Sequence, residues 1–173
     1  YFFHFSNCTK ISTKRLFKGK GTFKLTSNES KRWFKNSNYK EVYVKSFDKK
    51  KLHAYEIKNK LNTWVIIVHG YTNNALEMLD VAYNFYKKGY SILLIDQRAH
   101  GKSDGVYSTH GFYERKDMLS WIDYINKKKK TKIILYGISI PFEILPDSLL
   151  EQVKNGINTL CLVLTIHLSH NNN

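Results

Sequence analysis

Three short apolar runs, separated by two helix-like segments, constrain the fold of this chain more than any other feature. The runs cover residues 64–68, 92–95 and 133–136 and are rich in isoleucine, valine and leucine. A continuous apolar run of this length is typical of a strand that is buried on both faces of a sheet. Between the runs, apolar residues recur at helical spacing over 75–86 and over 118–125. This alternation predicts parallel strands with right-handed crossovers, and hence an α/β three-layer sandwich with a mostly parallel sheet.

A β-hairpin is predicted ahead of the first run. Apolar and polar residues alternate over 41–44 and again over 53–57, and the residues between them, 47–49, favour a turn. Beyond the third run the pattern is weaker. A capping box predicts a short helix over 149–153, and one further strand is expected within 157–168.

The net charge of +14 is concentrated in the first third of the chain. Residues 1–60 hold 16 basic and 4 acidic side chains, whereas residues 61–173 hold 12 and 10. Because the rest of the chain is nearly neutral, we expect no nucleic-acid partner. Residues 1–38 show no sustained period and predict a basic N-terminal arm or linker, with at most a short helix near Trp33. The predicted domain occupies residues 39–173.

Composition excludes several other classes of protein. A hydrophobic content of 42% is that of a globular domain, and no run of eighteen apolar residues occurs. Cys8 and Cys161 lie far apart without a C-x-x-C spacing, so neither a zinc cluster nor a disulfide framework is indicated. The aromatic opening at residues 1–5 is interpreted as the end of a lost anchor or signal segment. Cytoplasmic and membrane-anchored locations both stay open.

Each of the three apolar runs is followed by a loop with a distinctive sequence. The three segments are VIIVHGY at Val65–Tyr71, DQRAHGKS at Asp96–Ser103 and LYGISI at Leu135–Ile140. Because the carboxyl ends of parallel strands lie at one edge, these loops should meet there. In this order they resemble the α/β-hydrolase superfamily, in particular its bacterial serine aminopeptidase-like and lysophospholipase-like esterase branch. The resemblance is strongest over residues 39–140.

This resemblance implies a catalytic nucleophile and two hydrogen-bond donors. Ser139 matches the nucleophile of the G-x-S-x-G elbow, a sharp turn that holds a hydroxyl clear of its own backbone. The backbone N–H groups of Tyr71 and Ile140 match the donors that bind the negative oxygen of the transition state. Tyr71 is also a candidate for the wall of the acyl pocket.

Other residues of these loops are expected to have structural roles. His69 should shape its turn rather than act as a base, since the base of this fold comes last in the chain. Asp96, Arg98 and Ser103 should hold the second loop in shape. Ala99 stands where the family pattern usually has glycine.

The chain departs from the family pattern after the nucleophile. Pro141 replaces the second glycine of the elbow, and proline biases the residue before it away from helical angles. Only 34 residues follow Ser139, and neither His167 nor His170 lies in a loop that resembles the family's base loop. We therefore expect a truncated chain with little or no turnover, because a serine without its base is a poor nucleophile.

The resemblance implies a serine hydrolase that acts on a small acyl ester, or on the peptide or amide bonds of short peptides, through an acyl-enzyme. It implies neither a cofactor nor a metal. Two other interpretations stay open. One is a non-enzymatic fragment that associates with a membrane or a partner through its basic arm, residues 1–38, or through a lost anchor. The other is a product that does not fold stably, because parallel strands with unpaired edges leave core surface exposed.

Overall fold

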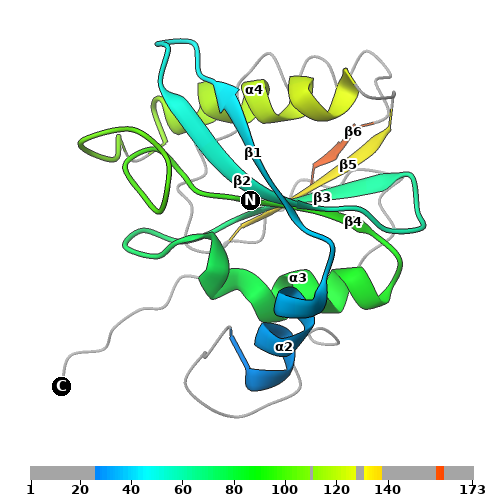
Figure 1. The fold of residues 1–173 in the computed structure, drawn as a ribbon. Helices are drawn as coiled ribbons and strands as arrows, with labels where there is room; N and C mark the ends of the chain where they lie inside the picture. The colour runs from blue at the N-terminus through cyan, green and yellow to red at the C-terminus, as the bar shows by residue number, and fades with distance from the viewer. Residues whose placement is uncertain (1–25, 110, 128–130, 138–158, 162–173) are drawn as a thin grey trace, which may run out of the picture.

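The computed structural model describes residues 26–109, 111–127, 131–137 and 159–161. Within them, six strands form one mixed sheet in the order β1-β2-β4-β3-β5-β6 (Figure 1). The strands are β1 Lys40–Lys45, β2 Lys51–Ile57, β3 Thr63–Val68, β4 Ser91–Ile95, β5 Lys132–Gly137 and β6 Thr159–Cys161. The helical segments are α2 Asn28–Asn36, the 3-10 helix η1 Ala75–Met78, α3 Leu79–Lys87 and α4 Glu114–Asn126.

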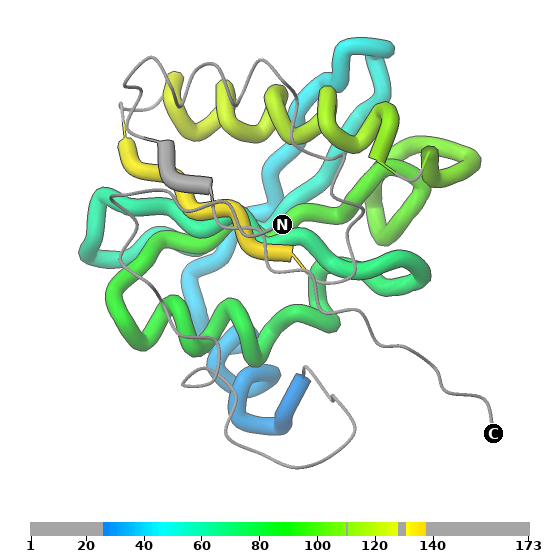
Figure 2. Tube along the Cα trace, turned by 180° about the vertical axis from the view of Figure 1, so that it is seen from behind, coloured from blue at the N-terminus to red at the C-terminus, as the bar shows by residue number. Residues whose placement is uncertain are grey.

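Helices cover both faces of the sheet, which confirms the predicted three-layer sandwich. Helices α2 and α3 lie on one side and α4 lies on the other, as Figures 1 and 2 show from opposite directions. The side chains of β3 alternate between the two faces. Val65 and Ile67 belong to the core cluster that contains α3, whereas Ile66 and Val68 belong to the cluster that contains α4. All four are at most 3% exposed, as expected for a strand buried on both faces.

The predicted N-terminal hairpin is present at one edge of the sheet. Strands β1 and β2 pair antiparallel, with Val42 opposite Ala54, and the turn between them brings Lys45 opposite Lys51. Strand β2 also pairs antiparallel with β4, so the hairpin extends the sheet. Strands β4, β3, β5 and β6 are parallel to one another.

The predicted helices are confirmed, although their starts differ from those suggested by the apolar pattern. The first begins as η1, where the side chain of Asn74 accepts a hydrogen bond from the backbone N–H of Leu76. It ends before Gly89, whose φ of 92° fits a glycine C-terminal signal. Helix α4 begins at Glu114, four residues before the first apolar residue of its predicted face.

Helix α2 packs on α3. The ring of Trp33 stacks on Tyr83 with centroids 5.2 Å apart, and the hydroxyl of Ser27 donates to Asp80 at 2.7 Å. The sequence predicted at most a short helix near Trp33, and the helix has nine residues. The boundary proposed at residue 38 stays a prediction. The helix predicted over 149–153 lies outside the described residues, whereas β6 falls inside the stretch expected to hold a further strand.

Candidate active site

Three strands end at the same level, and their exit loops therefore share one edge of the sheet. Val68, the last residue of β3, pairs with Ile95 at the end of β4 and with Gly137 at the end of β5. This arrangement confirms that the three strands that precede the motif-bearing loops end together at one edge of the sheet. Ser139 and Ile140 lie outside the described residues, two and three positions beyond Gly137.

The loops after β3 and β4 are fastened to each other by His69 and Gln97. The His69 ring is fully buried, and its Nε2 accepts a hydrogen bond from the backbone N–H of Gln97 at 3.0 Å. Its Nδ1 donates to the carbonyl oxygen of Gly70 at 2.7 Å. The Gln97 side chain donates in turn to the His69 carbonyl oxygen at 2.6 Å. His69 therefore shapes its turn, as expected.

The imidazole of His69 is held in the neutral form. Burial lowers the pKa of His69 below its ordinary value of 6.5, because the protonated ring would lose its hydration. The hydrogen bond to Gly70 offsets part of this effect. A ring that accepts from one backbone group and donates to another needs a neutral state with one proton, on Nδ1.

Tyr71 lies in the turn that leaves β3. Its side chain is 58% exposed, and its ring centroid is 6.0 Å from that of His100 in the next loop. The following residue, Thr72, has a φ of 71°, which β-branched residues rarely adopt. Such strain is often found where a loop must present a backbone group in a set direction.

The carboxylate of Asp96 is the hub of the β4 loop. Its Oδ1 accepts from the backbone N–H of Ala75 at 2.8 Å, at the start of η1. Its Oδ2 accepts from the His53 ring at 2.7 Å and from the backbone N–H of Lys102 at 3.1 Å. Asp96 is only 3% exposed, so these partners replace the water that the charge would otherwise bind. The loop after β4 is thereby tied to β2 and to the turn after β3.

The DQRAHGKS loop needs a glycine at position 101 and tolerates alanine at position 99. A Cβ atom on Gly101 would lie 2.1 Å from the carboxyl carbon of Asp96, so any side chain there would displace the hub. Ala99 has a φ of 62°, in the left-handed region that favours glycine. Alanine can occupy this region at a cost, which explains how the chain departs from the family pattern here without losing the loop.

Ser103 closes the loop onto the hairpin. Its hydroxyl donates to the carbonyl oxygen of Asp96 at 2.7 Å and accepts from the backbone N–H of His53 at 2.8 Å. Both partners are backbone groups: His53 lies in β2, and Asp96 directly follows β4. Ser103 therefore has the structural role that the sequence predicted for it.

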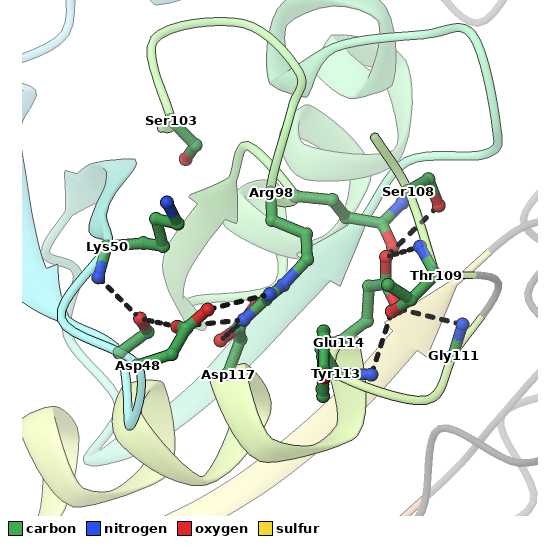
Figure 3. A network of polar contacts seen from close by, with 12 residues as sticks. Asp48, Lys50, Arg98, Ser103, Ser108, Thr109, Gly111, Tyr113, Glu114 and Asp117 are labelled. Atoms are coloured by element: carbon green, nitrogen blue, oxygen red, sulfur yellow. Dashed lines mark hydrogen bonds and ion pairs between the residues drawn. The ribbon is translucent and has the colours of Figure 1, made fainter. Parts of the chain in front are cut away.

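Arg98 joins the loop to the hairpin turn and to α4 (Figure 3). Its guanidinium donates two hydrogen bonds of 2.7 Å to Asp117 and two longer ones, of 3.2 and 3.3 Å, to Asp48. Burial tends to lower the pKa of Arg98, but the two carboxylates outweigh it and raise that pKa. The guanidinium also lies over the ring of Tyr113, 4.9 Å from its centroid. Arg98 thus holds its loop in shape, as expected.

Glu114, the first residue of α4, holds the end of the same loop (Figure 3). Its carboxylate accepts from the Ser108 hydroxyl at 3.0 Å, from the backbone N–H and hydroxyl of Thr109 at 2.8 and 2.5 Å, and from the Gly111 N–H at 2.8 Å. Burial tends to raise the pKa of Glu114, yet the hydrogen bonds from Thr109 and Gly111 outweigh it and lower that pKa.

A narrow cavity lies between this network and the core. Its volume of about 10 Å³ is close to that needed by one water molecule, so it is not a substrate pocket. Its lining combines polar loop and helix residues with core side chains: Leu52, Val68, Ile95, Asp96, Gln97, Arg98, Glu114, Asp117, Met118 and Trp121. Within the described ranges, no group of three or more His, Cys, Asp or Glu residues could hold a metal ion, and no helix has the length and apolar character of a membrane span.

Sequence reasoning missed several residues that position the site. Gln97 lies inside the quoted motif but had no assigned role, and His53 was treated only as part of a strand. Asp117 and Glu114 lie in the first turn of α4. Acidic residues there are usually attributed to the helix dipole, so nothing in the local pattern pointed to Arg98 or to the loop as their partners.

Comparison with known proteins agrees with this geometry. Residues 59–140 match the family described as "Serine aminopeptidase, S33". A probable lysophospholipase of Haemophilus influenzae is 32% identical over 59 residues, which are 34% of this chain and 19% of that protein. An uncharacterized protein of Bacillus subtilis is 36% identical over 64 residues, which are 37% of this chain and 21% of that protein.

Solved structures show the same fold. An esterase of Pyrococcus furiosus is 30% identical with a TM-score of 0.55, and the match covers 68% of this chain and 46% of the esterase. A putative hydrolase of Agrobacterium vitis has a TM-score of 0.59 at 18% identity, covering 73% of this chain and 51% of that one. The chain therefore spans about half the length of these hydrolases. It has the α/β-hydrolase fold, and over residues 59–140 it is similar to the serine aminopeptidase family.

Proposed function

We propose that this chain carries the nucleophile of a serine hydrolase, which cleaves a carboxylic ester or the amide bond of a short peptide through an acyl-enzyme on Ser139. The observation that carries the proposal is that β3, β4 and β5 end at the same level of the sheet. Gly137, two residues before Ser139, pairs directly with Val68, three residues before Tyr71. Ser139 and Tyr71 therefore follow the ends of two neighbouring strands at one edge of the sheet, where a nucleophile and an oxyanion donor could act together.

Apart from the general base, the reaction uses groups that the motifs at this edge carry. The hydroxyl oxygen of Ser139 attacks the acyl carbon, its proton passes to a general base, and the carbonyl electron pair moves onto the carbonyl oxygen. That oxygen becomes negative and is stabilised by the backbone N–H groups of Tyr71 and Ile140. The leaving group departs with a proton, and water then releases the acyl group from Ser139. Loss of one oxyanion donor typically costs about 3–4 kcal/mol of transition-state stabilisation.

Two features support preorganisation of the Tyr71 turn. The His69 side chain is fixed by Gly70 and Gln97, so the peptide before Tyr71 is anchored to the neighbouring loop. Thr72, the next residue, has a φ of 71°, and such a conformation persists only where the surrounding structure constrains the backbone. An oxyanion donor is effective only when it is already aimed before the charge develops, and such a turn meets that requirement.

An ester is favoured as the substrate over an amide. The similar proteins include an esterase and a probable lysophospholipase. Tyr71 is largely exposed beside His100, and together they offer a mixed aromatic and polar surface for a small acyl substrate.

Labelling with a fluorophosphonate tests the proposal, because this probe reacts with an activated serine hydroxyl. We expect the label to be found on Ser139 by peptide mass spectrometry and to be absent from the Ser139→Ala variant. The position of the label and the rate of labelling report different properties. Selectivity for Ser139 tests the nucleophile, whereas a slow rate would agree with the expectation of little turnover. Label spread over other serines, or none on Ser139 after prolonged exposure, would overturn the assignment.

A further inference from the structure

Three turns meet beside Arg98 and carry exposed apolar side chains. They are the β1–β2 turn, the loop that follows β4, and the turn that directly precedes α4, which lie close together in Figure 1. Four large apolar residues project from them: Phe47 is 47% exposed, Val106 92%, Tyr107 68% and Phe112 55%. We call these four residues the aromatic rim. Exposed apolar residues scattered singly are ordinary, but a group of this size on adjacent turns marks a contact surface.

The aromatic rim rests on a rigid base. The rings of Phe47 and Phe112 both contact Tyr113, with centroids 5.3 and 5.1 Å apart. Beneath them, Arg98 ties the hairpin turn to α4, and the four hydrogen bonds to Glu114 hold the loop that contains Val106 and Tyr107. The polar network in Figure 3 therefore holds these apolar side chains at the surface.

Cations surround the aromatic rim. The Lys116 ammonium lies 4.6 Å from the centre of the Phe47 ring, and the Arg115 guanidinium lies 5.1 Å from that of Phe112. The hairpin adds three exposed lysines: Lys49 in its turn, and Lys45 and Lys51 at the strand ends beside it.

Most of the acidic side chains near the aromatic rim are paired or buried. Asp48 is paired with Arg98, and Glu114 is buried under its loop. Asp104 is exposed, but its carboxylate accepts from the backbone N–H of Lys51. The charge presented to solvent around the aromatic rim is therefore predominantly positive.

We propose that the aromatic rim docks this protein on an anionic phospholipid bilayer. Aromatic rings settle at the level of lipid headgroups, and lysine and arginine beside them pair with lipid phosphates. The positive charge around the aromatic rim favours an anionic partner. Val106, the most exposed of the four residues, is aliphatic and cannot stack on bases, so its exposure favours a membrane over a nucleic acid. This inference does not depend on the proposed hydrolysis. It also places membrane contact on the folded domain rather than on the N-terminal arm, residues 1–38.

Flotation with lipid vesicles tests this surface on the full chain. We expect binding to phosphatidylcholine vesicles that contain phosphatidylglycerol, weaker binding to pure phosphatidylcholine vesicles, and release as the salt concentration rises. The double variant Val106→Ser/Phe112→Ser should partition about tenfold more weakly, because it removes apolar area that would enter the interface. The double variant Lys49→Glu/Lys116→Glu should lose most binding to the anionic vesicles.

Matched controls separate this surface from general basicity. The variant Lys31→Glu/Lys35→Glu makes the same charge change on α2, and Leu76→Ser removes an apolar side chain that is 37% exposed on η1. Both should bind nearly as well as the original chain. Equal losses in these controls, or no vesicle binding by the original chain, would overturn the proposal. If the chain bound single-stranded DNA tightly and the aromatic rim variants bound it more weakly, the partner of this surface would be a nucleic acid rather than a membrane.

Discussion

At the scale of single residues, Ala99 is the clearest point where the chain departs from its relatives. The family pattern usually has glycine at this position, and here alanine adopts a φ of 62°. A left-handed conformation costs an L-residue about 1–2 kcal/mol, part of which is offset because alanine is less flexible than glycine in the unfolded chain. The loop evidently tolerates this cost, because its anchor is the Asp96 hub rather than the backbone at Ala99.

Ala99→Gly should therefore stabilise the protein by about 0.5–1 kcal/mol. The shift can be measured as a higher urea midpoint with an unchanged slope. Ala82→Gly is a useful control, since Ala82 lies inside α3, where glycine should destabilise by about 1 kcal/mol or more. If both variants were equally destabilised, the strain at Ala99 would be ruled out.

His69 should remain neutral at pH values where an ordinary histidine is half protonated. Its folded pKa lies below 6.5, so as the pH falls through 6.5 the unfolded chain takes up a proton that the folded protein does not. Stability is then lost at about 1.4 kcal/mol per pH unit, until the folded pKa is reached.

An NMR titration of the imidazole carbons measures this effect directly. We expect the His69 signals to change below pH 6.5, with the proton on Nδ1 throughout the neutral range. A midpoint at or above 6.5 would show that burial and the hydrogen bond from Gln97 do not hold the ring in its neutral form.

At the scale of elements, α4 is coupled to the β4 loop by its first residue. Glu114→Gln keeps the shape but replaces one acceptor oxygen with a donor, which would face N–H or hydroxyl groups of the loop. Hydrogen bonds to charged groups contribute about 1.5–3 kcal/mol, and we expect a loss of this size in thermal or urea unfolding. The exposed Asp123 on the same helix is the control, and Asp123→Asn should change stability by less than about 0.5 kcal/mol.

The charge of Glu114 also predicts an acid dependence. Its folded pKa is below the ordinary 4.5, so its contribution is complete above pH 4.5 and is lost as the pH falls through the folded pKa. The original chain should lose this stability in acid, whereas Glu114→Gln should not. If the free energies of unfolding of the two proteins fell in parallel with decreasing pH, the role given to the carboxylate would be contradicted.

Most elements could be predicted from the sequence because their apolar patterns report burial directly. The strands around Val65 and Ile134 have no polar face, so only a buried parallel position fits them. Helix α2 was underestimated because Trp33 and Phe34 pack on one short face, and its attachment through Ser27 and Asp80 joins residues 53 positions apart. Periodicity cannot reveal contacts between such distant positions.

The candidate site was predicted in outline for a different reason. The order of the three loops identified the edge, and His69, Asp96, Arg98 and Ser103 have the structural roles expected of them. The partners of these residues were not predictable, since His53, Asp117 and Asp48 lie on other elements and carry no motif of their own. Ser139, Ile140 and the oxyanion role of Tyr71 stay predictions.

At the scale of the whole molecule, Arg98 ties the hairpin, the sheet edge and α4 together through its hydrogen bonds to Asp48 and Asp117. It is 4% exposed, with Asp117 at 6%. Arg98→Lys should cost about 3 kcal/mol or more, because a lysine cannot present two parallel donors to Asp117 and leaves a buried carboxylate poorly paired. Lost packing over Tyr113 adds to this cost.

A double-mutant cycle distinguishes the pair from its surroundings. Arg98→Met alone should be strongly destabilising, since it leaves Asp117 buried without its cation, and Asp117→Leu alone should leave Arg98 with only Asp48. The combined variant Arg98→Met/Asp117→Leu should recover much of the stability, because apolar side chains of similar size remove both desolvation costs at once. If the two single effects simply added in urea unfolding, Arg98 and Asp117 would not be coupled, and the hairpin would have to be joined to α4 by its ring contacts instead.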